Sequence, residues 1–223
     1  MKLTLPVVMS LNAGVVDTAG FLALQGLFTA HVTGNFVTIG ASAVFGSSGT
    51  PAKLLALPVF CGVIIVTRLL AFTLPRVGLP VLRTMLTLEF LLLALGAVLA
   101  IVLGPFKAAD EGAIIATGMV LVAAMAIQNA ASRIHLATAP PTTLMTGTTT
   151  QMMIDIADLL RGVEPEARQT ARARLARMTP NVVGFALGCA LGAGLFDLFG
   201  NRCFLLPPLL AILPVLMPDS AEA

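Results

Sequence analysis

The sequence predicts an all-α polytopic membrane protein with six transmembrane helices and two short broken or re-entrant helices, arranged as two inverted repeats. Three observations lead to this prediction: scarce charge, long apolar runs and a repeated Thr-Gly motif. Of the 223 residues, 57% are hydrophobic and only 11% are charged, whereas a soluble domain has about 25% charged residues. So few charges exclude a soluble globular protein, and the high hydrophobicity excludes a disordered chain.

Six apolar segments are long enough, or nearly so, to cross the hydrocarbon core, which takes about 20 residues. They are residues 5–28, 54–74, 81–103, 112–136, 180–199 and 204–217. The first segment has an alternative interpretation as a signal peptide, because Leu11-Asn12-Ala13 loosely matches a cleavage site. Its apolar run continues to Phe28, beyond the roughly 7–15 apolar residues of a signal peptide, so we expect a retained helix.

Two further apolar runs, residues 35–45 and 148–160, do not fit an ordinary span. The first is too short. The second ends in Asp155 and Asp158, which a lipid-facing helix carries only at a large cost in free energy. These two acids share one helix face. We expect them to form a salt bridge with Arg161 at the helix end, and a cation entry site is the alternative.

The longest hydrophilic stretch comprises residues 161–177 and contains five arginines. From Glu164 onward its pattern is typical of a short amphipathic helix at the membrane surface. The positive-inside rule places this stretch in the cytoplasm. It is either a plain topology anchor or a docking segment for anionic lipid or a partner.

An internal repeat relates the two halves of the chain. Thr33-Gly34-Asn35 corresponds to Thr146-Gly147-Thr148, and each motif follows a long apolar helix and opens one of the short runs. Farther on, residues 58–62 and 180–184 share the pattern P-x-x-x-G at an offset of 122. The first repeat is expected at residues 1–104 and the second at 105–223, with the basic segment 161–177 inserted in the second. Chance recurrence of Gly and Pro at helix ends is the alternative.

The basic residues discriminate between two topologies for the short runs. If both runs cross the membrane fully, eight basic residues lie inside and five lie outside. If both are re-entrant, ten lie inside: Lys2, Arg68, Arg76, Arg83, Arg133 and the five arginines of residues 161–177. The positive-inside rule favours the second topology. It puts three full spans in each half, so the halves insert in opposite orientations and both termini are cytoplasmic.

The Thr-Gly breaks are the first candidates for a binding site. Inverted repeats with broken helices recur in transporters, whose sites lie near the bilayer midplane. A helix that starts at such a break presents free N–H groups, which suit an anionic or polar solute. The hydroxyls of Thr33 and Thr146 are expected to cap these helix starts. The alternative is that Gly34 and Gly147 only permit tight turns.

Polar side chains at membrane depth supply the other candidates. Asp17 lies among apolar residues, with Asn12 before it on a loosely shared face, and is expected to bind a substrate, a cation or a proton. Its alternative role is a buried partner for a helix N-terminus or for Arg68. His31 is either a proton relay or an interfacial cap, and Glu89 is expected to pair with Arg68. The amides Asn35, Gln128 and Asn129 serve either as ligands or as interhelical hydrogen bonds. Thr148, in the second Thr-Gly motif, is a further candidate ligand.

Two blocks of the first half are distinctive: residues 14–24, GVVDTAGFLAL, and residues 28–35, FTAHVTGN. In the second half, AIQNA at residues 126–130 and MTGT at residues 145–148 accompany them. Over about residues 10–200 the chain resembles the YoaK-type family of bacterial integral membrane proteins, a family of unknown function. The resemblance implies a multi-pass protein of the bacterial inner membrane and supplies no substrate, reaction or cofactor.

Several functions are excluded or disfavoured. The sequence has no H-E-x-x-H, G-x-S-x-G or Walker A motif, so no enzyme activity, metal or cofactor is expected. A net charge of +2 gives no reason to expect nucleic-acid binding. The lipid bilayer is the expected environment. A stripe of small residues is expected to pack helices together, inside the chain or in a homodimer: Gly184, Gly188 and Gly192.

The favoured function is therefore a secondary transporter or channel-like protein for a small polar or anionic solute, with protons coupled through Asp17 and His31. The alternative is a non-transporting membrane scaffold or accessory subunit, which predicts tightly packed breaks without a cavity. An intramembrane enzyme would require Asp17 and Asp155 to converge. A tag in the Ser47–Ser48 loop is expected to be external.

Overall fold

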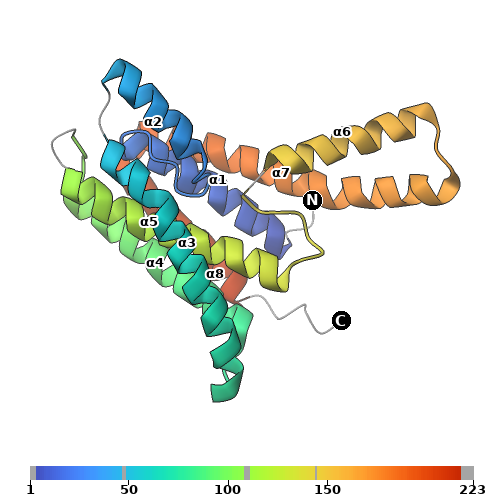
Figure 1. Ribbon diagram of the computed structural model, residues 1–223, viewed down its shortest axis with the longest axis horizontal. Helices are drawn as coiled ribbons and strands as arrows, with labels where there is room; N and C mark the ends of the chain where they lie inside the picture. Colours follow the sequence, from blue (N-terminus) through green and yellow to red (C-terminus); the bar gives the residue numbers. More distant parts are fainter. Residues whose placement is uncertain (1–3, 47–48, 108–110, 144, 217–223) are drawn as a thin grey trace.

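The computed structural model describes residues 4–46, 49–107, 111–143 and 145–216 (Figure 1). Helices make up 85% of the structure, and no strand occurs within these ranges. Five helical segments are long and apolar enough to cross a membrane, by length and composition. The predicted class, an all-α polytopic membrane protein, is therefore confirmed. The fifth segment, Pro165–Leu216, contains more than one helix, so the expected number of six spans stays a prediction.

In the described part of the first half there are four α-helices and one short 3₁₀ turn. They are α1 (Leu5–Ala23), α2 (Gly34–Phe45), α3 (Thr50–Thr73), η1 (Leu74–Val77) and α4 (Val81–Leu103). The bounds of α4 are those expected. By contrast, α1 ends at Ala23 rather than at residue 28, because Gln25 and Gly26 adopt left-handed backbone angles, with φ of 57° and 79°. These two residues reverse the chain and begin the first break segment, residues 24–33.

The second half has the same order of elements but a longer penultimate helix. Its elements are α5 (Glu111–His135), α6 (Met145–Arg161), α7 (Pro165–Phe199), η2 (Gly200–Leu205) and α8 (Leu206–Leu216). The second break segment, residues 136–143, lies between α5 and α6. A surface helix from Glu164 and a span from Pro180 were expected as separate elements, and this expectation was wrong. They form one helix that continues through Pro180.

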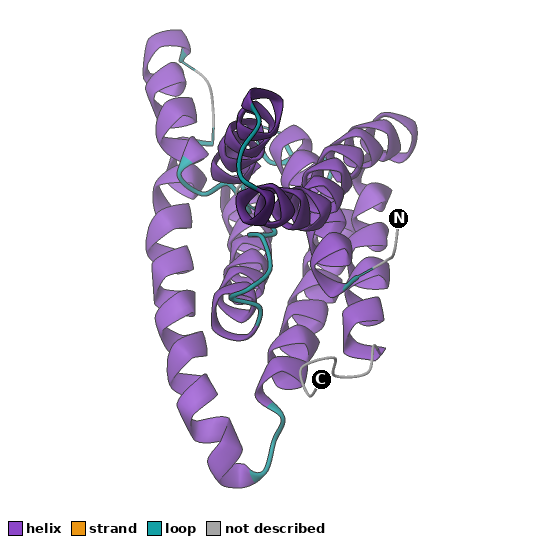
Figure 2. Cartoon of the chain, turned by 90° about the vertical axis from the view of Figure 1, so that its right-hand side faces the viewer, coloured by secondary structure: helices purple, strands orange, loops and turns teal. Residues whose placement is uncertain are grey.

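The length of α7 shows that it extends beyond any bilayer core. At 1.5 Å per residue, its 35 residues make a rod of about 52 Å, whereas the hydrocarbon core is about 30 Å thick. The arginine-rich first half of α7 packs against α6, and Figure 1 shows these two helices side by side, projecting from the bundle. In Figure 2 the same two helices point toward the viewer. We call α6 together with residues 165–180 the arm.

The arm is held by an ion pair that the sequence did not predict. Asp155 is fully buried and accepts hydrogen bonds from Nε of Arg174 at 3.0 Å and from Nη2 at 2.5 Å. The expected partner was Arg161, three residues beyond Asp158. Because α7 runs alongside α6, Asp155 points to Arg174 across the hairpin instead. The hydrogen bonds from the Arg174 guanidinium lower the pKa of the Asp155 carboxyl below its ordinary value.

Replacing Arg174 by methionine is expected to separate α6 from α7, because Asp155 then remains buried without its cation. Faster amide hydrogen exchange in α6 would show this separation, with Arg172→Met, an exposed neighbour on the same helix, as the control. A carboxyl with a lowered pKa stabilises the fold at neutral pH, and this stabilisation is lost as the pH falls below about 4. Unchanged exchange in R174M would contradict the assigned role.

The closest contact of the bundle joins α1 to α7, which run parallel. Residues Gly184, Gly188 and Gly192 are buried and face Val7, Leu11 and Val15 in the same order along α1. A Cβ atom at Gly188 would overlap the carbonyl oxygen of Leu11, and one at Gly14 would overlap that of Phe185. We call this contact the glycine seam. The glycine stripe considered for a homodimer is thus already covered by α1 inside the chain.

Candidate functional site

The site is centred on Asp17, which is 4% exposed and lies in the C-terminal half of α1. Its Oδ1 accepts hydrogen bonds from the backbone N–H groups of Thr29 and Ala30, both at 2.8 Å. The N–H of His31 and the hydroxyl of Thr29 approach the same oxygen at 3.4 and 3.3 Å. The other oxygen, Oδ2, lies 3.4 Å from Nδ1 of His31. One carboxylate thus joins a helix, the break segment and a histidine.

The local sequence explains why the break segment reaches Asp17. The left-handed pair Gln25-Gly26 turns residues 27–31 back along α1. A Cβ at Gly20 would lie 3.0 Å from the Thr29 side chain, so glycine at this position allows the close approach. Asn35 then closes the loop, because its Nδ2 donates to the Phe28 carbonyl at 2.8 Å and its Oδ1 accepts from the Phe28 N–H at 2.9 Å.

The start of α2 is not the open anion site that the sequence suggested. The N–H groups of residues 34, 35 and 36 donate to the carbonyls three residues earlier, at 2.8, 3.1 and 3.2 Å. Thr33 has a helical backbone, and its hydroxyl makes no capping hydrogen bond. The expected cap is therefore wrong. The anion bound by the amides of the first break segment is the Asp17 carboxylate itself. This role is close to the alternative that the sequence offered for Asp17, a buried partner for a helix N-terminus.

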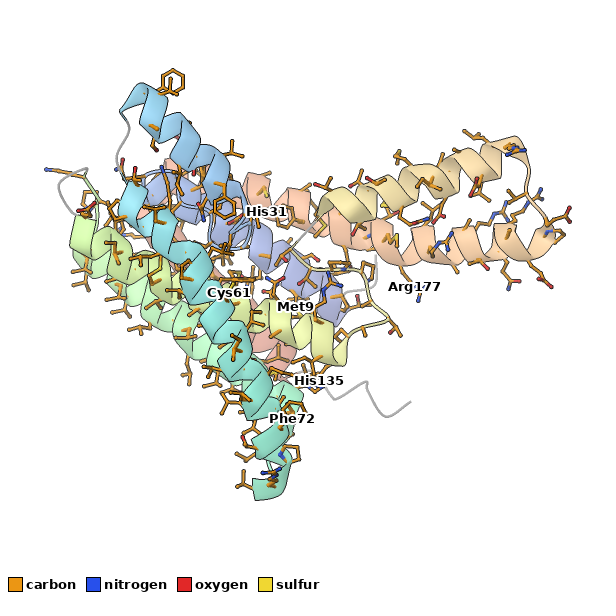
Figure 3. The ribbon with its side chains drawn as sticks, in the orientation of Figure 1. Met9, His31, Cys61, Phe72, His135 and Arg177 are labelled. Carbon is orange, nitrogen blue, oxygen red and sulfur yellow. The ribbon has the colours of Figure 1, made fainter. Side chains whose placement is uncertain are left out.

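A cavity of about 380 Å³ opens beside this carboxylate, between α1, the first break segment and α7. Four rings line it and contact one another in turn. The distance between ring centroids is 4.8 Å for Phe21 and Phe28, 6.4 Å for Phe28 and His31, and 5.7 Å for His31 and Phe185. Figure 3 shows His31 near the start of α2, beside α1. Asp17, His31 and Cys189 are the titratable residues that line it. No lysine or arginine is among its lining residues.

The sequence did not suggest Phe21, Phe185 or Cys189 as site residues. A usable signal existed for the last two. The glycine stripe of α7 marks the face that packs on another helix, and residues 185 and 189 each follow one of its glycines. Had Gly14 been recognised as the partner of that stripe, Asp17 would have been placed near Cys189 by helical spacing.

The second break segment is fixed by amides and hydroxyls instead of a carboxylate. Gln128 donates from Nε2 to the Met9 carbonyl and to the Thr142 hydroxyl, both at 3.1 Å. Asn129 accepts a hydrogen bond from the Thr143 hydroxyl at 2.8 Å. Gln128 therefore forms the interhelical hydrogen bond that the sequence allowed, from α5 to α1, whereas Asn129 bonds to the break segment. In each half, then, a polar residue of the long helix holds the segment that follows it.

The other candidates lie away from the Asp17 cavity. Thr146 and Gly147 lie in the first turn of α6, exposed, so Thr146 is inside the helix and is not its cap. Thr148 and Asn12 are buried and form no part of the cavity lining. The expected pairing of Glu89 with Arg68 was also wrong. The Arg68 guanidinium lies 4.3 Å over the ring of Phe72, and Glu89 is buried.

The two breaks were expected to line one solute site, and this expectation was wrong, because no cavity among the described residues adjoins both of them. A second cavity of about 390 Å³ adjoins the second break segment and is lined by residues that include Val7, Pro140 and Asn181. An open groove of about 710 Å³ runs along α6. Neither shares a lining residue with the Asp17 cavity. Val7 and Asp17 are ten residues apart on α1, about 15 Å along the helix, so the cavities lined by these two residues lie at different depths along the glycine seam.

Comparison with known proteins links the chain to a family. A family model described as "Protein of unknown function (DUF1275)" matches residues 5–217. No curated protein matches the chain, and no solved structure does. The family match covers both break segments, the glycine seam and the Asp17 cavity, and it adds no activity to them.

Proposed function

Because this chain belongs to the DUF1275 family, whose function is unknown, we propose a function from its site: secondary transport or channel-like passage of a small polar solute, coupled to protons through Asp17 and His31. We further propose that the protein lies in the bacterial inner membrane and that its finer classification is the YoaK-type family. For this chain we propose neither an enzyme activity nor a metal or cofactor.

One observation carries this proposal, namely the Asp17 carboxylate buried in a membrane helix beside a cavity. A charged side chain at the bilayer centre costs at least about 2.5–3.5 kcal/mol. A neutral serine or asparagine would hold the break segment without that cost, as Asn129 and Gln128 do in the second half. The charge of Asp17 is therefore expected to have a role besides holding the break segment in place. His31 lies against the carboxylate oxygen that binds no backbone amide, and histidine is the side chain that titrates near neutral pH.

The packing supports the proposed inverted repeats, residues 1–104 and 105–223. The first helix of each half packs against the third helix of the other, since α1 contacts α7 and α5 contacts α3. Both third helices contain an internal proline, Pro58 and Pro180. In each half the short second helix packs on the third helix. Such reciprocal packing supports two halves related by symmetry, and inverted repeats related in this way recur in transporters.

The same contacts select among the alternatives. The amides of the first break are bound to Asp17, which argues against an anionic solute at this place. A scaffold protein predicts a packed break without a cavity, whereas a cavity of about 380 Å³ adjoins this one. Asp155, the other acid considered for an intramembrane enzyme, is ion-paired with Arg174 in the arm. A polar solute with proton coupling is the function that these contacts favour.

We propose that the arm and both termini are cytoplasmic, which replaces the re-entrant placement that the sequence suggested for residues 148–160. The parallel course of α1 and α7 puts the basic half of α7 on the side where α1 begins. Nε of Arg83, at the start of α4, donates to the Val215 carbonyl near the end of α8 at 3.3 Å, so the last described turn lies on the arginine-rich side. The Ser47–Ser48 tag position lies outside the described residues.

Cysteine labelling at described positions tests this orientation. In a cysteine-free background, Ala43→Cys on α2 is expected to react with an impermeant maleimide added to intact cells. Ala173→Cys on the arm should react only after lysis; both positions are exposed. Labelling of the arm in intact cells would reverse the orientation. Labelling of Ala43 only after lysis would restore the topology with eight full spans.

Proteoliposomes that enclose a pH-sensitive dye test the transport proposal. Amino acids, sugars and ammonium compounds are added outside one at a time, and the internal pH is recorded. At least one compound is expected to change it, and Asp17→Asn and His31→Gln should abolish the response. Glu89→Gln removes another buried carboxyl outside the cavity and is the matched control. A folded protein that responds to no compound would favour the scaffold alternative.

A further inference from the structure

The chemistry of the Asp17 cavity specifies a class of solute more narrowly than "small and polar". Its lining combines one carboxylate with the rings of Phe21, Phe28 and Phe185, and it contains no lysine or arginine. Its volume of about 380 Å³ lies at the small end of ligand cavities, which range over roughly 300–1,000 Å³. The cavity is thus apolar and aromatic with a single negative charge.

Aromatic rings beside a carboxylate are typical of sites for organic cations. The face of a phenyl ring attracts an ammonium group, and aromatic cages bind alkylated ammonium in this way. Of the two Asp17 oxygens, Oδ1 is occupied by the break segment, while Oδ2 lies against Nδ1 of His31. A cation in the cavity would therefore meet a carboxylate oxygen not already used by the backbone.

We propose that this cavity binds a small organic cation with apolar substituents, such as an alkylated or aromatic ammonium ion, in exchange for a proton carried by His31. The proposal rests on the proposed function, since it takes the cavity as the solute site. The class of ligand is set by the carboxylate and the three phenyl rings, and the exchange is set by the distance between His31 and Asp17.

The exchange follows from charge balance at one carboxylate. A protonated His31 neutralises Asp17 from 3.4 Å and repels a second cation. When the imidazolium releases one proton to water, the carboxylate charge is left for the incoming cation. The titratable groups that face His31 are Asp17 of α1 and Cys189 of α7; the break segment contributes none. One cation bound for one proton released leaves the net charge of the site unchanged.

Calorimetric titration of the protein in nanodiscs tests the ligand class with three compounds that share a phenyl ring. Benzyltrimethylammonium is the cation, benzyl alcohol the neutral control and phenylacetate the anion. At pH 8 the cation is expected to bind at least tenfold more tightly than benzyl alcohol, and phenylacetate should not bind. Asp17→Asn should weaken cation binding at least tenfold, whereas Glu89→Gln should leave it unchanged. Phe185→Leu, which keeps an apolar side chain and removes the ring, should weaken it severalfold.

The pH dependence tests the exchange. Because the proposed exchange releases a proton when the cation binds, the wild-type affinity for benzyltrimethylammonium should fall as the pH is lowered from 8 to 5.5. His31→Gln should bind the cation equally at both pH values. Asparagine at position 17 keeps an oxygen that can accept the backbone N–H groups, and an unchanged thermal unfolding temperature would show that D17N folds.

Two results would overturn this proposal: benzyl alcohol or phenylacetate binding as tightly as the cation, or D17N binding the cation like the wild type. The proteoliposome assay separates this failure from that of the proposed function. If other solutes drive Asp17-dependent proton movement while benzyltrimethylammonium does not bind, only the ligand class is wrong. If the cation binds through Asp17 and no solute moves protons, the site stands and transport is wrong.

Discussion

Replacing Gly188 by alanine is expected to destabilise the protein at the upper end of the ~1–3 kcal/mol typical of overpacking. The new methyl group would overlap the carbonyl oxygen of Leu11. Because this neighbour is backbone in a helix, it cannot rotate away as a side chain would. Relief requires α1 and α7 to separate along their whole contact, which reduces the packing of the central helix pair.

The glycines of α7 supply a graded series of controls. A Cβ at Gly192 would lie 2.9 Å from the Val15 carbonyl oxygen, and one at Gly184 would lie 3.3 Å from that of Val7. A Cβ at Gly194 would meet nothing within 4 Å. Unfolding in mixed micelles should therefore rank the alanine variants, with G188A least stable, then G192A, then G184A. G194A should match or exceed the wild type, because alanine favours helix. An equal loss in all four would show that the seam is not the cause.

Replacing Asp17 by alanine is expected to release the first break segment and to cost about 2–6 kcal/mol of stability, since each buried donor left unsatisfied costs about 1–3 kcal/mol. The N–H groups of Thr29 and Ala30 both lose their acceptor at 2.8 Å. Hydrogen exchange should rise at residues 27–31 before it rises elsewhere.

Asp17→Asn separates the two roles of this residue. Asparagine retains an oxygen for the backbone N–H groups and removes the charge, so D17N should lose proton coupling while staying close to wild-type stability. Asn129→Ala in the second break is the matched deletion, because it removes the acceptor of the Thr143 hydroxyl and should spare the first break. If D17A is as stable as the wild type, water has replaced the carboxylate and the assigned structural role is wrong.

Helix positions could be predicted from the sequence wherever burial in lipid determines the pattern of apolar residues. The span 81–103 matches α4 at both ends, since an apolar run between Pro80 and Gly104 has few alternatives. The end of α1 was missed, because the left-handed turn at Gln25 contains a residue that ordinarily favours helix. The continuity of α7 was missed for the opposite reason, since Pro180 in a sequence favours a helix boundary.

The site was only partly predictable from the sequence. The burial of its charged residue could be predicted, whereas the partners of that residue could not. Asp17, His31 and Asn35 do come together at the first break. Burial of a charge is visible in sequence, because an acid among apolar residues in a span has few inexpensive explanations. Which groups satisfy that charge depends on how the chain turns back. The sequence therefore pointed to an external anion at the break amides, a place that Asp17 itself fills.

The glycine seam has a mechanical consequence. A gate built from side chains opens by rotamer changes on the picosecond-to-nanosecond timescale, whereas packed helices shift over microseconds to milliseconds. Between the cavities lined by Val7 and by Asp17, the backbones of α1 and α7 are in contact at Gly14 and Gly188. Under the proposed transport function, passage of a solute along this pair requires α1 and α7 to separate, because their contact is made by backbone atoms. The rate of opening is then expected to be that of helix movement, microseconds to milliseconds, rather than that of side-chain rotation.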